Sequence, residues 1–238
     1  MSNTSLGLGD KGSKLWMGLY ANSEVIRNLE PEWYKWDNSS GKWKLEPINY
    51  NPYSNNDIEF LSPLSKHFEE YQLNNADIKK MLGLSKMKFN FWASRQPQWD
   101  GIAVDNVDAI KTADPEKINE IYLFEAKAHA SEIELGESKN ITNIRAMSDY
   151  FILPTTGKYY YQIINRLVFL YELKKFYENN KKVKLIFLNF YHDFTYHYEK
   201  LNKIKKEYEQ AWNTLVSNPA SPNKDDYSDV YVGFVKVD

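Results

Sequence analysis

Runs of apolar residues along the chain mark its expected strands. The run Lys184–Phe190 is almost wholly apolar, which is typical of a strand covered on both faces of a sheet. Shorter runs predict further strands, and the turn-rich Asp37–Gly41 between two Trp-containing segments predicts a hairpin. The expected extended segments are the hairpin Trp33–Glu46 and the strands Lys88–Ala93, Trp99–Val104, Ile121–Ala128, Lys184–Phe190 and Tyr227–Val237.

Apolar residues that recur every three to four positions predict helices. Tyr159–Tyr177 is apolar on most sides, so we expect it to be buried. A single apolar stripe from Leu201 to Leu215 predicts an amphipathic helix. Weaker patterns predict helices over Asn140–Phe151 and over Asn75–Leu82, the latter ending at Gly83. A further helix is predicted to begin at a cap, Ser62 or Ser65, and to run through Tyr71. We expect residues 1–14 to be flexible and Pro47–Asn56 to form a loop.

The order of these elements predicts the class of fold. Three successive strands, a helical crossover and a fourth strand indicate a mixed sheet with helices on its faces, an α/β (α+β) arrangement. A length of 238 residues suits one domain with additions. We expect residues 1–60 to form an N-terminal extension packed on the core, and residues 61–238 to form the core domain with a C-terminal helix and strand added.

Composition narrows the class of protein. The chain has no Cys, which excludes disulfides, thiolate zinc sites and cysteine nucleophiles and fits a cytoplasmic location. It shows no signal peptide and no apolar run long enough to cross a membrane. A net charge of −2 excludes a globally basic nucleic-acid binder. Lysines do cluster locally, at Lys174, Lys175, Lys181, Lys182 and Lys184, and at Lys200, Lys203, Lys205 and Lys206. Each cluster could be a solvated helix face or a phosphate-binding patch.

Two neighbouring predicted strands carry the chain's clearest candidate chemistry. Asp100 heads one strand, and strand periodicity places Glu125 and Lys127 on one face of the next. Other acid-x-Lys triplets occur in the chain, but only this one lies in an apolar strand, where charges are costly unless paired or ligated. Either a divalent metal bridges Asp100 and Glu125, or Asp100 caps a turn while Glu125 and Lys127 form an ion pair.

This pattern resembles the PD-(D/E)xK nuclease superfamily. The order of elements resembles its restriction-endonuclease-like αβββαβ core, over roughly Ser62 to Phe190. The resemblance implies that Asp100 and Glu125 bind metal and that Lys127 is catalytic. In this chain the Pro-Asp pair of the family is not intact, because Pro97 lies three residues before Asp100.

The residue types suit hydrolysis assisted by Mg²⁺ or Mn²⁺. Mg²⁺ prefers oxygen ligands and keeps several waters, and Asp100, Glu125 and the main-chain carbonyl of Ala126 could supply three positions. The cation lowers the pKa of its water and stabilises charge on a phosphate, while Lys127 could orient that water or stabilise developing charge. We therefore expect a metal-dependent nuclease of restriction, repair or defence type, with DNA as the first expected substrate.

Two further residues are candidates for the same site. Many family members carry a glutamate on the helix before the first strand, and of Glu59, Glu69 and Glu70 we choose Glu70, although solvent exposure is the ordinary expectation for all three. Gln162 resembles the glutamine on the helix after the lysine strand in exonuclease-like members, whose tyrosine four residues on is replaced by Arg166. Alternatively, Gln162 belongs to a polar strip at the surface.

Other functions fit parts of the sequence. A catalytically inactive nuclease-fold module could bind nucleic acid or a protein partner, and the 18 Tyr and 7 Trp would suit a carbohydrate-binding surface. Trp33, Trp36 and Trp43 could stack on bases, or they could pack the hairpin onto its own domain. A homodimer would suit double-strand cutting, but no residue argues for one.

Overall fold

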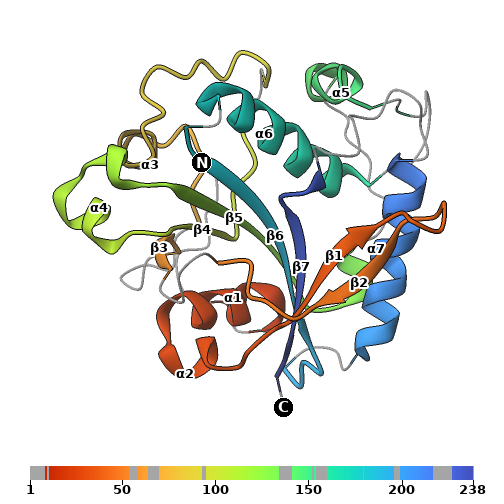
Figure 1. Cartoon of the computed structure of the whole chain (residues 1–238). Helices are drawn as coiled ribbons and strands as arrows, with labels where there is room; N and C mark the ends of the chain where they lie inside the picture. Colours follow the sequence, from red (N-terminus) through yellow and green to blue (C-terminus); the bar gives the residue numbers. More distant parts are fainter. Residues whose placement is uncertain are drawn as a thin grey trace.

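Seven strands form one mixed sheet in the computed structural model of the chain, in the order β2-β1-β7-β6-β5-β4-β3 (Figure 1). Strands β5, β6 and β7 run parallel, and every other neighbouring pair is antiparallel. The strands are β1 (Glu32–Asp37), β2 (Lys44–Ile48), β3 (Glu59–Ser62), β4 (Gly101–Val104), β5 (Glu120–Lys127), β6 (Lys182–Tyr191) and β7 (Val230–Lys236). The structure describes residues 9, 11–53, 58–63, 70–92, 95–133, 141–151, 153, 160–178, 180–195, 199–216 and 227–237.

Helices flank this sheet, which confirms the predicted α/β class with a mixed sheet. The apolar side chains of β5 and its neighbours face two separate clusters, one shared with α1 and the other with α6 and α7. The helices are α1 (Gly12–Asn22), α2 (Glu24–Arg27), α3 (Ala76–Met81), α4 (Val107–Thr112), α5 (Ile141–Ser148), α6 (Tyr161–Tyr177) and α7 (Leu201–Val216), with short 3-10 turns at Pro115–Lys117 and Ala130–Ile133.

The best predicted elements are those with the strongest apolar patterns. Helix α6 is buried along most of its length, and β6 is buried at nine of its ten positions. Asn75 begins α3 as its cap, since its side chain accepts hydrogen bonds from the backbone of Asp77 and Ile78. Gly83, at φ +74°, follows the end of α3 as predicted.

One predicted strand and one predicted helix are wrong in their described parts. Lys88–Trp92 forms no strand; Phe91 and Trp92 instead pack against Phe169 of α6, with ring centroids 5.1 and 5.3 Å away. The third antiparallel strand is β3, so Ser62 ends a strand rather than capping a helix. At the far end of that predicted helix, Glu70 and Tyr71 are not helical, and residues 64–69 lie outside the described residues.

Residues 11–14 belong to the segment predicted to be flexible, of which residues 1–8 and 10 lie outside the described residues. Helix α1 begins within the segment predicted to be flexible and packs against the sheet next to Gly101, where an added Cβ would lie 2.5 Å from Met17 Cε. The predicted hairpin is confirmed as β1 and β2, and β1 pairs with β7 in the same sheet.

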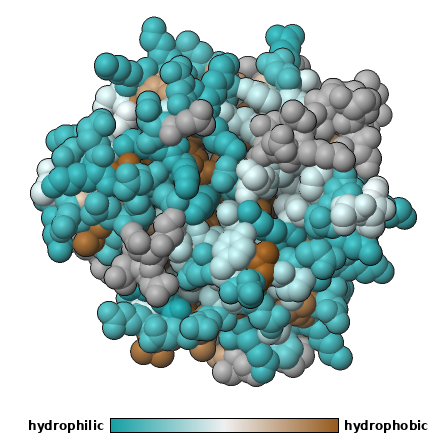
Figure 2. Space-filling model, viewed as in Figure 1, coloured by the Kyte–Doolittle hydropathy of each residue, from teal (hydrophilic) through white to brown (hydrophobic). Residues whose placement is uncertain are grey.

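The hairpin tryptophans pack inward, which favours the interpretation that they pack the hairpin onto its own domain. Trp33 and Trp43 are buried, and Trp36 stacks on Trp212 of α7 at a centroid distance of 4.2 Å. Figure 2 shows one face of the molecule, on which hydrophilic residues predominate and apolar ones form small scattered patches. Of the helices that the structure describes, none has the length and apolar character that crossing a bilayer requires.

Candidate functional site

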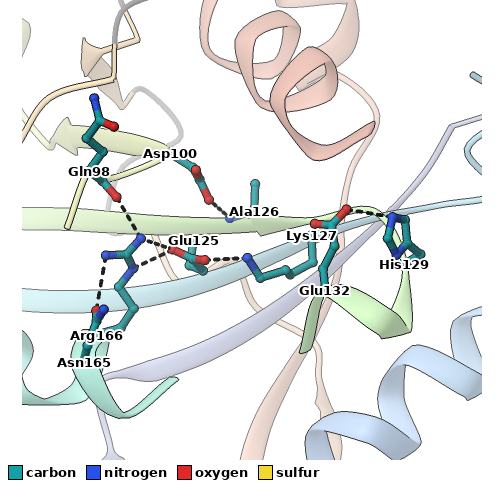
Figure 3. A network of polar contacts seen from close by, with 9 residues as sticks. All are labelled: Gln98, Asp100, Glu125, Ala126, Lys127, His129, Glu132, Asn165 and Arg166. Carbon is teal, nitrogen blue, oxygen red and sulfur yellow. Dashed lines mark hydrogen bonds and ion pairs between the residues drawn. The ribbon is translucent and has the colours of Figure 1, made fainter. Parts of the chain in front are cut away.

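Antiparallel pairing of β4 with β5 brings Asp100 next to Glu125. Gly101 lies opposite Phe124, so the preceding residue, Asp100, lies opposite Glu125 at the point where β4 begins. Asp100 Oδ2 accepts a hydrogen bond of 2.6 Å from the backbone N–H of Ala126 (Figure 3). The two carboxylates predicted to share a site are therefore neighbours.

Two cations hold the Glu125 carboxylate, one on each oxygen. Lys127 Nζ lies 2.5 Å from Oε1, and the Arg166 guanidinium lies 2.5 Å from Oε2 (Figure 3). Lys127 comes from the same face of β5, two residues on, whereas Arg166 comes from α6. All three side chains are buried, so these contacts are desolvated and hold the carboxylate firmly.

Arg166 ties α6 to the segment that leads into β4. Its Nη2 donates a 2.7 Å hydrogen bond to the carbonyl of Gln98, and its guanidinium carbon lies 4.5 Å from the centre of the Trp99 ring. Arg166 is not among the site residues predicted from the sequence. A signal was present, because Arg166 lies four residues after Gln162 and so shares its helix face.

Burial and neighbouring charge shift the two carboxylates in opposite directions. Burial raises the pKa of Asp100 to about 8, and the charges of Glu125 and Glu70 add to the effect, against Lys127 and Arg166. Burial also acts to raise the pKa of Glu125, but Arg166 and Lys127 outweigh it and leave that pKa below its ordinary value. Asp100 therefore holds its proton at neutral pH unless another cation compensates its charge.

Glu70 and Gln162, the two weaker predictions, also lie at this site. Burial raises the pKa of Glu70, Lys14 lowers it, and the Glu125 charge raises it, so the Glu70 carboxylate is close enough to sense Glu125. The carbonyl of Glu70 accepts a hydrogen bond from Gln98. Gln162 lines a small cavity together with Glu125 and Lys127. The structure thus gathers all five predicted residues around one end of β5.

His129 and Glu132 border the site beyond the end of β5. His129 Nε2 lies 3.0 Å from Glu132 Oε1, and its Nδ1 lies 2.6 Å from Ser131 Oγ. Burial would lower the pKa of Lys127, but Glu125 and Asp100, with a smaller contribution from Glu132, raise it above its ordinary value. Lys127 is therefore a firmly charged ammonium in this arrangement.

The oxygen atoms present fit a hard divalent cation only if main chain and solvent contribute. Among the described residues, no group of three or more His, Asp or Glu side chains is placed to hold a metal ion. The N–H of Ala126 points to Asp100, and the N–H and C=O of one strand residue face the same edge, so its carbonyl also faces Asp100. Asp100, Glu125 and this carbonyl are three oxygen donors, which suits an ion that keeps several waters. A cation there would also compensate the charge of Asp100.

Four lysines of the two sequence clusters make contacts within the protein. Lys174 pairs with Asp229 at 2.7 Å, Lys184 is buried against Glu120, and Lys203 pairs with Glu199. Lys181 donates to the carbonyls of Pro115 and Ile118. These contacts disfavour a phosphate-binding patch built from these four lysines.

Comparison of the chain with models of protein families, with curated proteins and with solved structures gave no significant match.

Proposed function

We propose that this chain is a metal-dependent nuclease of the PD-(D/E)xK superfamily that hydrolyses phosphodiester bonds of nucleic acid, with DNA as the first substrate to test. The observation that carries the proposal is the meeting of Asp100, Glu125 and Lys127 at the adjoining ends of β4 and β5. Two acidic side chains beside a buried ammonium, one of them with a raised pKa, support a site that binds a divalent cation and acts on a phosphodiester.

The topology around the site supports the same proposal. Strands β3, β4 and β5 form an antiparallel meander, α6 crosses over, and β6 returns parallel to β5. With α1 on one face and α6 on the other, this order resembles that of a restriction-endonuclease-like core, with α1 and β3 in place of the first helix and first strand that the sequence predicted. The hairpin β1–β2 and the elements α7 and β7 are then additions to that core.

Each residue has a defined task in this proposal. Asp100, Glu125 and the Ala126 carbonyl would hold Mg²⁺ or Mn²⁺. The ion would supply a water of lowered pKa and neutralise charge on the phosphate. Lys127, kept charged by its neighbours, would orient the attacking water or stabilise negative charge on the phosphate oxygens. Arg166 would keep Glu125 in one orientation through its contacts with Gln98 and Trp99.

A second candidate is a catalytically inactive module of the same fold that binds nucleic acid or a protein. The favouring observation is that both oxygens of Glu125 already have a cationic partner. Under this candidate, Lys127 and Arg166 stabilise a buried carboxylate and no ion is required.

Cleavage assays separate the two candidates. Wild-type protein and Glu125→Gln would be incubated with linear, nicked and single-stranded DNA, and with RNA, in Mg²⁺, Mn²⁺ or EDTA. We expect wild type to cut at least one substrate only with metal, and Glu125→Gln to cut about 10²-fold more slowly or not at all. Equal cutting by both proteins would show that the site is elsewhere. Failure of wild type on every substrate would favour the inactive module.

A further inference from the structure

A small cavity lies beside Glu125 and Lys127, on the side of the sheet that α6 and α7 cover. Its volume of about 10 Å³ is at the lower limit of what one water molecule needs. Nine residues line it: four are aliphatic or aromatic, and the other five are Glu125, Lys127, Glu132, Gln162 and Tyr208. A site this small suits one water molecule better than any larger ligand.

Tyr208 is the least expected member of this group. It comes from α7, outside the strands and helices that carry the other site residues, and its side chain is 1% exposed. Its ring packs against Phe187 of β6 at a centroid distance of 5.5 Å. Within the part of the chain that the structure describes, its hydroxyl has no hydrogen-bond partner of normal geometry, although the Asn189 amide lies nearby.

The charges of the site carboxylates affect the Tyr208 hydroxyl. Burial raises the pKa of Tyr208 well above its ordinary value, and the charge of Glu125 raises it further, with smaller effects from Glu132 and Asp100. The phenol therefore stays protonated and can donate. A buried hydroxyl without a partner is destabilising, and Phe would fill the same space without that penalty.

We propose that the Tyr208 hydroxyl donates to a single water held in this cavity between Tyr208, Gln162 and the Glu125–Lys127 pair. Buried waters typically make two to four hydrogen bonds, and these side chains offer that number. The water fixes the direction of the Lys127 ammonium, so Tyr208 is a positioning residue supplied by α7. This positioning role rests on the proposed nuclease function, whereas the water site itself does not.

The test compares Tyr208→Phe with Tyr177→Phe. Tyr177 is a matched control, because it is also buried and its hydroxyl has a protein partner away from the site, the carbonyl of Leu82 at 2.8 Å. Crystal structures of wild type and Tyr208→Phe are expected to show one water bonded to Tyr208 Oη and no water at that position in the variant. Tyr208→Phe is expected to lower kcat about tenfold at unchanged KM, as loss of an indirect partner does.

The control Tyr177→Phe is expected to keep the kcat of wild type and to have a Tm lowered by about 2–4 °C. A dry cavity in wild type, or a raised Tm in Tyr208→Phe, would overturn the water site, because both indicate a hydroxyl that has no partner. A bound water with equal kcat in wild type and Tyr208→Phe would overturn the positioning role alone. A wild-type protein that cuts nothing would overturn that role together with the proposed function, while the crystal structures still decide the water site.

Discussion

Strand β5 carries two buried carboxylates with lysine partners, and they differ in how their charge is balanced. Near its start, Glu120 contacts Lys184 at 2.7 Å and the Tyr122 hydroxyl at 2.5 Å, with Lys182 at 3.8 Å. Near its end, Glu125 contacts Lys127 and Arg166, but Asp100 and Glu70 bring further negative charge to the same place.

The difference separates a structural ion pair from a candidate site. Around Glu120, two lysines pair with one carboxylate, and Lys184 also donates a hydrogen bond to the carbonyl of Pro52. Around Glu125, Asp100 is left with a pKa of about 8. A carboxylate forced to keep its proton at neutral pH can accept a divalent cation in place of that proton. Burial alone does not distinguish the two clusters, but the surplus of acidic groups around Glu125 does.

The largest expected effect is on cleavage, when each cluster loses its lysine charge. Lys127→Met is expected to lower the rate of Mg²⁺-dependent cleavage by about 10²–10³-fold, because no ammonium then stabilises charge on the phosphate. Lys184→Met is expected to leave the rate of the folded protein unchanged. Steady-state cleavage of one DNA substrate by both variants checks this. Equal losses would mean that the two clusters have the same role.

Stability is expected to reverse that order. Lys184→Met removes the closest cation from buried Glu120 and is expected to lower the free energy of unfolding by about 3–5 kcal/mol. Lys127→Met is expected to lower it less, because Arg166 still pairs with Glu125. Urea unfolding followed by tryptophan fluorescence measures both. A larger loss in Lys127→Met would contradict the assignment of the Glu120 cluster to the fold.

Metal binding is expected to depend on Asp100 and not on Glu120. Mn²⁺ at about one hundred times its Kd is expected to raise the Tm of wild type by about 5–10 °C. Asp100→Asn keeps the shape of the side chain but loses the surplus charge, so we expect its Tm to change little with Mn²⁺. Glu120→Gln is the matched control and should respond as wild type does. A full response in Asp100→Asn would exclude Asp100 as a ligand.

The pH dependence of metal-free protein gives a separate measure of Asp100. An aspartate in an unfolded chain ionises near pH 3.9, whereas folded Asp100 holds its proton up to about pH 8. The folded state thus binds the extra proton between these values, and the stability that Asp100 contributes falls as pH rises from about 4 to about 8. The free energy of unfolding of Asp100→Asn, measured with denaturant, should therefore rise relative to that of wild type as the pH increases across this window. A constant difference would show that the folded carboxyl ionises normally.

The smallest effect is expected at the rim of the Glu120 cluster. Lys182 lies 3.8 Å from Glu120, and its side chain is 73% exposed. Lys182→Ala is expected to change the free energy of unfolding by no more than about 1 kcal/mol, because water screens an exposed pair. Its cleavage rate should equal that of wild type. A loss as large as that in Lys184→Met would place Lys182 among the essential partners of Glu120.

Sequence patterns predicted the elements that are buried on most sides, because such elements contain few polar residues. The apolar runs of β5 and β6 and the apolar helix α6 are examples, since a strand or helix covered on most sides has few polar positions. The candidate residues Glu125 and Lys127 stand out in the same way, as charges within an apolar strand, and Asp100 lies directly before the neighbouring strand. Strand β3 was missed because four residues carry little periodicity.

Other features depend on contacts that local patterns do not contain. The alternation in Lys88–Trp92 looks like a strand, but it arises because Phe89, Phe91 and Trp92 pack on α6. Tyr208 has the helical spacing of a core residue, and its hydroxyl matters only because α7 lies beside the Glu125 cavity. Helix α1 was missed because its N-terminal glycines suggested flexibility, whereas its packing against Gly101 is long-range.

The pairing of β1 with β7 has a consequence for how the chain folds as it is made. Glu32 lies opposite Phe234, so contacts between these strands join the two ends of the described chain. The hairpin β1–β2 must wait for β7 before it can join the sheet, whereas β3 to β6 and the cluster around Glu125 depend on strands made earlier. Because such distant contacts form late, a ribosome-bound chain lacking β7 should complete its ion cluster before its sheet.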